Sequence, residues 1–266
     1  MNTFQYTSNS YFLYILAGMI LLISATVPAD KNIDKADKYF SKRYDGAEKM
    51  KAKPRHINQA IKFYKKAIKV DSNRQEAVVG LLRSYEFKSK FAAANEKQKL
   101  EILDEAKNLS EQMSQQYPAN IKIKYWNLAI LGLWSRSVGV MKASSNDVAE
   151  RLIKKAETVI NQAPEYDQAG AYRILGGMHL KVPHIPFLIS WPSEDKALDY
   201  LHKAYTLAPQ NLANVVLYAQ VLYETGDTQQ AITLLKNIVD NNPRETNYLE
   251  DITYLRKARK LLKEYR

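Results

Sequence analysis

A pair of residues that recurs along the chain constrains its fold more than any other feature of the sequence. A small or apolar residue is followed twelve positions later by a proline or serine, and successive pairs start 46, 46, 45 and 34 residues apart. Repeats of this length indicate a helical solenoid, in which helical hairpins stack on one another. The pairs are Ala60 with Ser72, Ala106 with Pro118, Leu152 with Pro164, Ala197 with Pro209, and Ala231 with Pro243.

The last unit, residues 212–243, shows how one repeat is built. Its first helix has apolar residues at the i, i+3, i+4, i+7 spacing of a single helix face. Gly226 then ends that helix, and Pro243 ends the second helix because proline cannot continue it. This is the tetratricopeptide pattern. The matching residues are Val215, Tyr218, Ala219 and Leu222 in the first helix and Ala231, Leu235 and Ile238 in the second.

Extending this pattern predicts an all-α, tetratricopeptide-like solenoid of about five helical hairpins over residues 30–266. Residues 248–266 are expected to form an amphipathic helix that covers the last apolar face, which such arrays require. The first hairpin pairs a helix near residues 32–50 with one that follows it. Residues 182–193 contain three prolines, which predicts a long loop inside the fourth unit.

The N-terminal segment, residues 1–29, has no charged side chain and contains an apolar run from Tyr11 to Ile23. Val27 and Ala29 fit a signal-peptidase site before residue 30, which predicts export. The run is also nearly long enough to anchor the chain in a membrane. The lack of Lys and Arg before the run, and the basic segment after it, count against a simple signal peptide. We therefore expect an exported chain whose first segment is a signal peptide or a membrane anchor.

The net charge is +11 and is concentrated near the N-terminus. Residues 31–69 hold thirteen Lys and Arg against four Asp and Glu, a balance of +9. We interpret this segment as a solvated helix face, and the alternative is contact with an anionic membrane surface. No RRM, KH or zinc-finger pattern accompanies the charge, so nucleic acid is not expected as a partner.

The sequence contains no motif of a catalytic, cofactor or metal site. The absence of cysteine excludes disulfides, thiolate metal sites and a lipid-modified cysteine. The G-x-S-x-G, Walker A, H-E-x-x-H and G-x-G-x-x-G patterns are also missing. His179 and His184 do not have ordinary zinc-ligand spacing, so His179 is expected to fill an aromatic repeat position. We therefore predict a non-enzymatic protein without a metal or cofactor.

Two stretches resemble a particular family of repeat proteins. Residues 124–143, with Tyr125-Trp126, Gly132 and Trp134, and residues 170–186, with Tyr172-Arg173, are similar to the tetratricopeptide T-component family associated with TRAP transporters. The resemblance covers about residues 56–262. It implies an exported bacterial protein that cooperates with a periplasmic solute-binding protein, and a pore through the array that takes an apolar ligand. The chain departs from the family in lacking a lipoprotein cysteine.

The concave groove is the expected binding surface, because the first helix of each unit lines it. An aromatic and aliphatic wall beside one or two cations suits an apolar ligand with a carboxylate, or an extended peptide with its terminus. For the tryptophans the alternative is a core position between adjacent units, since large aromatics mostly bury for packing. The candidate binding residues are Trp126, Ile130, Trp134, Arg173, Lys181, Gln220 and Tyr223.

Two functions follow from these observations, and both are compatible with an oligomer. The first is a module that binds a peptide, a protein or an apolar ligand in the periplasm, or while tethered to the membrane facing it, as an accessory to an envelope solute transport system. The second is a membrane-associated scaffold or assembly factor that uses its basic first repeat.

Overall fold

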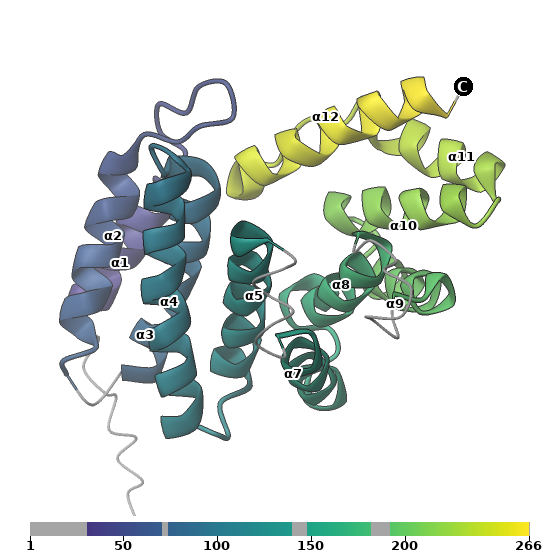
Figure 1. The fold of residues 1–266 in the computed structure, drawn as a ribbon. Coiled ribbons are helices and arrows are strands. Elements are labelled where there is room, and N and C mark those ends of the chain that lie inside the picture. Colours follow the sequence, from purple (N-terminus) through teal and green to yellow (C-terminus); the bar gives the residue numbers. More distant parts are fainter. Residues whose placement is uncertain (1–30, 71–73, 140–147, 182–191, 266) are drawn as a thin grey trace, which may run out of the picture.

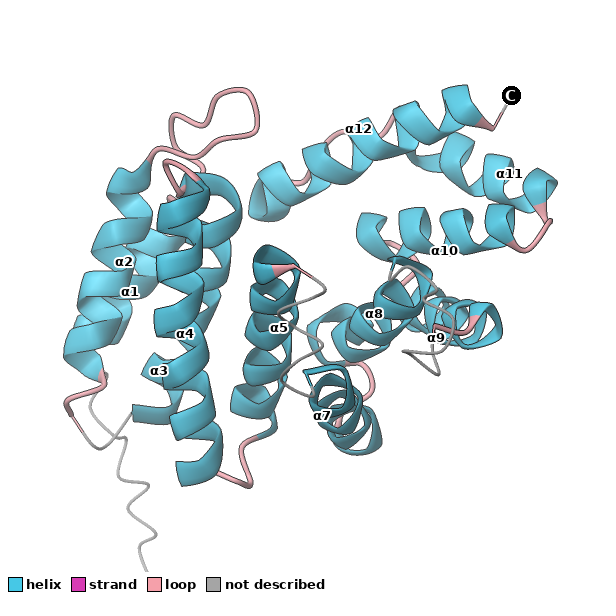
Figure 2. Ribbon diagram, viewed as in Figure 1, coloured by secondary structure: helices cyan, strands magenta, loops and turns pink. Residues whose placement is uncertain are grey.

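The computed structural model describes residues 31–70, 74–139, 148–181 and 192–265, and the regular elements in these ranges are helices (Figures 1 and 2). The predicted all-α, tetratricopeptide-like solenoid is confirmed. A π-turn, η2 Lys88–Ala92, extends α3, and a 3-10 turn, η3 Glu245–Asn247, precedes the last helix. The hairpins are α1 Lys31–Ser41 with α2 Pro54–Ala67, α3 Arg74–Phe87 with α4 Glu96–Gln116, α5 Ile121–Val138 with α7 Val148–Gln162, α8 Tyr166–Lys181 with α9 Glu194–Leu207, and α10 Leu212–Glu224 with α11 Thr228–Val239, followed by α12 Tyr248–Glu264.

The recurring residue pairs mark the second helix of each hairpin. In every unit the small or apolar residue of the pair is buried, with no more than 2% of its surface exposed, so that the second helix can approach a neighbouring helix closely there. The prolines at positions 118, 164, 209 and 243 lie in the loops that follow α4, α7, α9 and α11. Ser72 and most of the predicted proline loop, residues 182–191, lie outside the described residues.

Side chains just before several helices start them by accepting hydrogen bonds from free backbone N–H groups. The Asn120 side chain accepts from the N–H of Ile123 at the start of α5, and Asn211 accepts from Ala213 at the start of α10. Asn95, Ser193 and Asp227 make the same kind of contact before α4, α9 and α11. The helix boundaries are therefore encoded locally, and packing decides how the helices stack.

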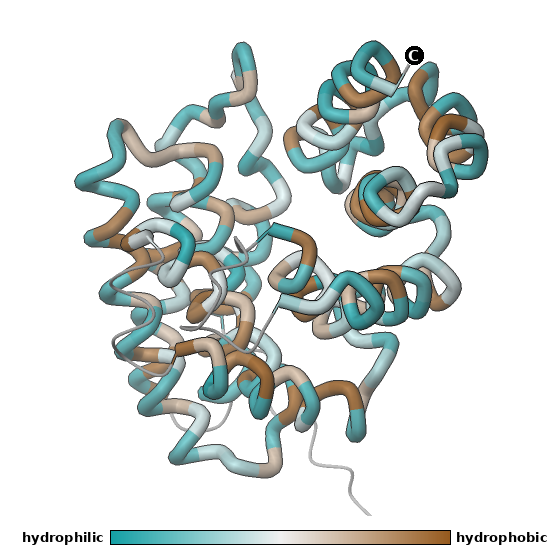
Figure 3. Tube along the Cα trace, turned by 45° about the vertical axis from the view of Figure 1, so that its right-hand side comes forward, coloured by the Kyte–Doolittle hydropathy of each residue, from teal (hydrophilic) through white to brown (hydrophobic). Residues whose placement is uncertain are grey.

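Three overlapping hydrophobic clusters form the core along the array, and hydrophobic positions recur along the helices in Figure 3. The C-terminal cluster includes Leu255, Ala258 and Leu262 of α12, so this helix covers the last repeat as expected. Leu249, at the start of the same helix, belongs instead to the cluster of α1–α4. The last helix therefore packs against both ends of the array.

Contacts just after α1 join the first repeat to the start of α12, which crosses the open side of the array in Figure 1. Arg43 donates to the carbonyl of Thr246 at 2.5 Å. The Tyr44 hydroxyl donates to Glu250 at 2.6 Å, and its ring packs edge-on against Tyr248. The inner helices and α12 thus enclose the concave side.

The helices in the described ranges are too short or too polar to cross a bilayer. The apolar run predicted as a signal peptide or anchor lies in residues 1–30, outside the described part of the chain.

Candidate binding cavity

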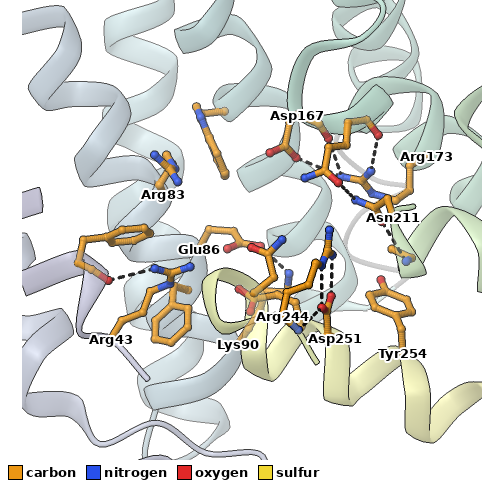
Figure 4. Close-up of a pocket in the computed structure, with 17 residues that line it drawn as sticks. Arg43, Arg83, Glu86, Lys90, Asp167, Arg173, Asn211, Arg244, Asp251 and Tyr254 are labelled. Carbon is orange, nitrogen blue, oxygen red and sulfur yellow. Dashed lines mark hydrogen bonds and ion pairs between the residues drawn. The ribbon is translucent and has the colours of Figure 1, made fainter. Parts of the chain in front are cut away.

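A cavity of about 160 Å³ lies where the inner helices α3, α5, α8 and α10 face α12 (Figure 4). Its lining is charged, whereas the sequence pattern predicted an aromatic and aliphatic wall. A site of this kind recognises polar and charged groups, because an apolar ligand would remove water from these charges without replacing it. The cations are Arg43, Arg83, Lys90, Arg173 and Arg244, and the carboxylates are Glu86, Asp167, Glu250 and Asp251.

Two arginines of the lining are held by carboxylates. Arg173 donates to Asp167 at 3.1 Å. Arg244 donates to Asp251 from Nε at 2.8 Å and from Nη2 at 2.7 Å, and its backbone N–H donates to the same carboxylate at 2.9 Å. Asp251 is only 2% exposed, so this set of bonds compensates for burying its charge. Both arginines are thereby fixed in place.

Arg83 on α3, like Arg43, is a cation of the lining that no carboxylate holds among the described residues. Lys90 donates to Glu86 at 2.5 Å, and Arg43 donates to backbone carbonyls, whereas the Arg83 guanidinium makes no hydrogen bond or ion pair with another described residue. Its guanidinium stands 4.9 Å from the ring centre of Phe40. It is exposed, and no dashed contact reaches it in Figure 4.

A second hollow of about 640 Å³ adjoins the cavity at Arg83, which lines both. It runs between α1, α3 and α5, and its walls include Asp37, Val79, Asn120 and Tyr166. The cavity and this groove therefore meet at the Arg83 guanidinium.

A left-handed turn at the start of α8 forms one wall of the cavity. Asp167, Gln168 and Ala169 have φ values of 51°, 56° and 60°, a conformation that costs a non-glycine residue roughly 1–2 kcal/mol. Arg173 donates to the carbonyl of Gln168 at 3.0 Å, and the Asn211 amide donates to the Gln168 side chain at 3.0 Å. Strained backbone persists only where its surroundings hold it, and it concentrates at functional sites.

Two buried side chains complete the support of this turn. The Tyr125 hydroxyl donates to Asp167, and burial, reinforced by that carboxylate, raises the pKa of Tyr125, so the hydroxyl stays a proton donor. Asn214 is fully buried and its amide donates to the carbonyls of Ala204 at 2.8 Å and Gln168 at 3.1 Å. Its oxygen accepts from Arg173 at 3.0 Å. The turn is thus tied to α5 through Tyr125 and to α10 through Asn214, which also bonds α9.

Burial also shifts the pKa of Glu250, the carboxylate at the start of α12 that contacts the first hairpin. Burial raises the pKa of Glu250, and the hydrogen bond from Tyr44 opposes that shift by stabilising the ionised form. Nearby Glu86 adds to the shift, while Lys90 reduces it. Burial likewise raises the pKa of Tyr44, which keeps its hydroxyl protonated as the donor.

The structure places the predicted binding residues of α5 mostly in the core. Ile130 is fully buried against the first cluster, so it does not reach the groove. Trp134 is 8% exposed and donates from Nε1 to Asp104 of α4 at 2.6 Å, and neither residue lines the cavity. Trp126 touches the cavity but is 7% exposed. The groove positions assigned to Ile130 and Trp134 are corrected here, because α5 is packed on several sides and its hydrophobic pattern marks no single face.

The other four predicted residues lie on the inner helices α8 and α10. Arg173 lines the cavity. Gln220 accepts a hydrogen bond from Lys257 of α12, and Lys181 lies beside the same lysine. Tyr223 is exposed and stacks on Tyr265, with 3.6 Å between ring centres. Ligand binding by these residues stays a prediction.

Sequence reasoning missed the charged residues of the cavity. Arg83 and Glu86 on α3 and Lys90 on the adjoining η2 follow the helical i, i+3, i+7 spacing on the face opposite the apolar stripe, a signal that was available in the sequence. Arg244, Asp251 and Tyr254 carry no comparable signal, because only the return of α12 across the array brings them to the cavity.

Comparison with known proteins supports the repeat assignment. Residues 194–250, which span α9 to the start of α12, match the tetratricopeptide repeat family. This stretch is therefore similar to a tetratricopeptide repeat, a unit that stacks into α-solenoids with extended concave binding surfaces. No curated protein sequence matches the chain significantly.

Proposed function

We propose that the chain binds an extended, acidic segment of a protein partner along its concave face, with Arg83 as the anchor. The position of Arg83 carries this proposal, since it lines both hollows and lacks a carboxylate partner among the described residues. A guanidinium in this state gains most from a carboxylate, which it can bind through two parallel hydrogen bonds.

The rest of the lining favours a peptide over the apolar ligand suggested by the sequence. The paired charges at Arg173 and Arg244 are held rigidly and leave polar groups facing the cavity, where they suit a peptide backbone. Val79 and Tyr166 of the adjoining groove add apolar contact for one or two side chains. Repeat arrays present extended concave binding surfaces, and arginines are a recurring means of recognising acidic peptide motifs.

Selection from a displayed random-peptide library on the immobilised full chain tests this function. We expect enrichment of peptides rich in Asp and Glu, because these supply the missing counter-charge. Their affinity, measured by calorimetry, should fall at least about tenfold for Arg83→Glu, which is the order of one charge-assisted pair. Arg83→Lys should lose less affinity, since lysine keeps the positive charge but cannot form two parallel hydrogen bonds to a carboxylate.

Arg256→Glu provides the matched control, because it makes the same charge change at an exposed position of α12 outside the cavity. Thermal unfolding by circular dichroism verifies that each variant is folded. Enrichment of peptides without acidic residues, or equal binding by Arg83→Glu and Arg256→Glu, would show that the concave guanidinium is not the anchor.

Export and a link to solute transport are also proposals, and they rest on the sequence alone. Residues 1–29 would act as a signal peptide or anchor, and a periplasmic solute-binding protein would then be one candidate source of the bound segment. The N-terminal residue of the mature protein decides the compartment. A start at Asp30, or an intact N-terminus in the membrane fraction facing the periplasm, supports export, and an intact chain in the cytosol contradicts it.

A second candidate function is a scaffold at an anionic membrane surface. It is favoured by the first hairpin and its flanking loops, where twelve of the thirteen basic side chains between residues 31 and 69 are exposed and only Arg43 is buried. Lys53 and Lys65 are partly neutralised by ion pairs with Glu48 and Glu105. Co-sedimentation of the chain with phosphatidylserine vesicles, lost when residues 31–69 are charge-reversed, would support this function over the first.

A further inference from the structure

The first hairpin and the last helix are bonded to each other directly, which the stacking of repeats does not require. In a solenoid each repeat contacts only its neighbours in the stack. Arg43 and Tyr44, in the turn after α1, nevertheless bond Thr246 and Glu250, which lie 203 and 206 positions further along the chain. Figure 1 shows α12 crossing the open side of the array to reach them. This contact therefore closes the concave face of the array.

The closing contact is made by few side chains. The Arg43 guanidinium donates from Nη2 to the Thr246 carbonyl at 2.5 Å and to the Tyr44 hydroxyl at 2.7 Å, and that hydroxyl donates to Glu250 at 2.6 Å. Leu249, which is 1% exposed, adds one apolar residue to the cluster of the first hairpins. The helices that α12 packs against most closely are α10 and α11. Contacts as limited as those to the first hairpin open without unfolding of the whole array.

The closed contact limits what the cavity can hold. Arg43 and Glu250 both line the cavity, so the contact forms part of its wall. The volume of about 160 Å³ is below the roughly 300–1,000 Å³ of pockets that surround a small-molecule ligand. An extended segment also needs about 3.3 Å of groove for each residue. The start of α12 therefore has to move away from the first hairpin before a partner segment can enter.

The two ends of α12 are attached in different ways, which allows such a movement. Leu255 and Leu262 in its C-terminal half are buried in the cluster shared with α10 and α11. Arg244, just before the helix, is clamped to Asp251 by hydrogen bonds of 2.7–2.9 Å, so it moves with the helix. Residues 240–243 form no helix and link this arginine to α11. The start of α12 can thus swing about its packed C-terminal half while the linker follows.

We propose that Arg43, Tyr44, Thr246 and Glu250 form a latch that keeps the concave face closed in the free chain and opens to admit the partner segment. The start of α12 then rests on the bound segment in place of the first hairpin. This regulation rests on the proposed function, since it acts on the same face. Only open chains can bind, so the apparent affinity falls with the fraction that is open, and weakening the latch strengthens binding.

The reactivity of a thiol placed in the cavity measures opening without any ligand. The chain has no cysteine, so Ala213→Cys, on the cavity wall with 7% of its surface exposed, introduces a single reporter. Its reaction with a bulky maleimide should be at least about fivefold faster when Tyr44→Phe removes the hydrogen bond to Glu250. Tyr85→Phe is the matched control, because it removes a bond of the same 2.6 Å length to Glu105 within the second hairpin, and it should leave the rate unchanged. Equal rates for the two variants would overturn the proposal.

Cross-linking the latch tests its control of partner binding. Tyr44 and Tyr248 pack with 6.2 Å between ring centres, and neither lines the cavity. A short bismaleimide joining Tyr44→Cys to Tyr248→Cys should slow association of a peptide rich in Asp and Glu at least about tenfold, relative to the same double variant capped with N-ethylmaleimide. Association at the same rate in the linked and capped chains would also contradict the latch. If no acidic peptide binds either form, the proposed function fails, while the thiol reaction still decides whether the latch exists.

Discussion

Gly176→Ala should destabilise the chain by about 2 kcal/mol and lower its thermal midpoint by roughly 4–8 °C. Gly176 lies where α8 crosses α9, and an added Cβ would stand 2.5 Å from Cγ and 2.8 Å from Cδ2 of Leu201. Leu201 is fully buried, and its backbone nitrogen would be 3.1 Å away, so rotating the side chain does not relieve the clash. The helices must move apart, and this cost exceeds the roughly 1 kcal/mol that alanine gains over glycine in a helix.

The neighbouring glycine provides the control for this prediction. A Cβ on Gly177 would meet only Leu217 Cδ1, at 4.0 Å, which is ordinary contact. Gly177→Ala should therefore be neutral or stabilising by up to about 1 kcal/mol. Urea titration of the two variants measures the difference in their unfolding free energies, which we expect to be about 2–3 kcal/mol. Equal stabilities would mean that α8 and α9 do not approach as closely as the structure shows.

Asn214→Ala should have the second large effect, a loss of roughly 2–4 kcal/mol. Asn214 has no exposed surface, and its amide bonds Ala204 and Gln168 while its oxygen accepts from Arg173. Alanine would leave the buried carbonyls of Ala204 and Gln168 and the Arg173 guanidinium without these hydrogen bonds. It would also release the strained turn at residues 167–169. Hydrogen exchange at the start of α8 should accelerate together with the loss of stability.

Asn161→Ala is the matched control, because Asn161 is exposed on α7 and its side chain makes no hydrogen bond with another described residue. Its effect should stay within about 0.5 kcal/mol. If Asn214→Ala unfolds at the same urea concentration as Asn161→Ala, the buried network around Arg173 does not support the cavity wall.

The repeat architecture is predictable because its signals are local. Ala60 and Ala231 recur at fixed spacing since every hairpin needs a close helix crossing, and both are fully buried. The capping role of α12 also follows from its own apolar stripe, which includes Leu255 and Leu262. A feature that is encoded within a short stretch of sequence and recurs in every unit can therefore be predicted from the sequence.

The cavity is not predictable in the same way. Tyr44 and Glu250 are far apart in the sequence, and no periodicity indicates that the last helix returns to the first hairpin. Ile130 and Trp134 belong to a helix that packs against neighbours on several sides, so their size and spacing do not show which of them face the groove. The arrangement of the inner helices in space decides both where the last helix packs and which residues of α5 face the groove.

The central claim is that the concave face, and not the outer surface, binds the partner segment. Hydrogen–deuterium exchange of the full chain, with and without the acidic peptide of highest affinity, tests this most directly. The account predicts slower exchange in α3, in the turn that starts α8 and in the first half of α12, which surround Arg83 and the cavity. Protection confined to the outer helices α2, α4, α7, α9 and α11 would contradict it.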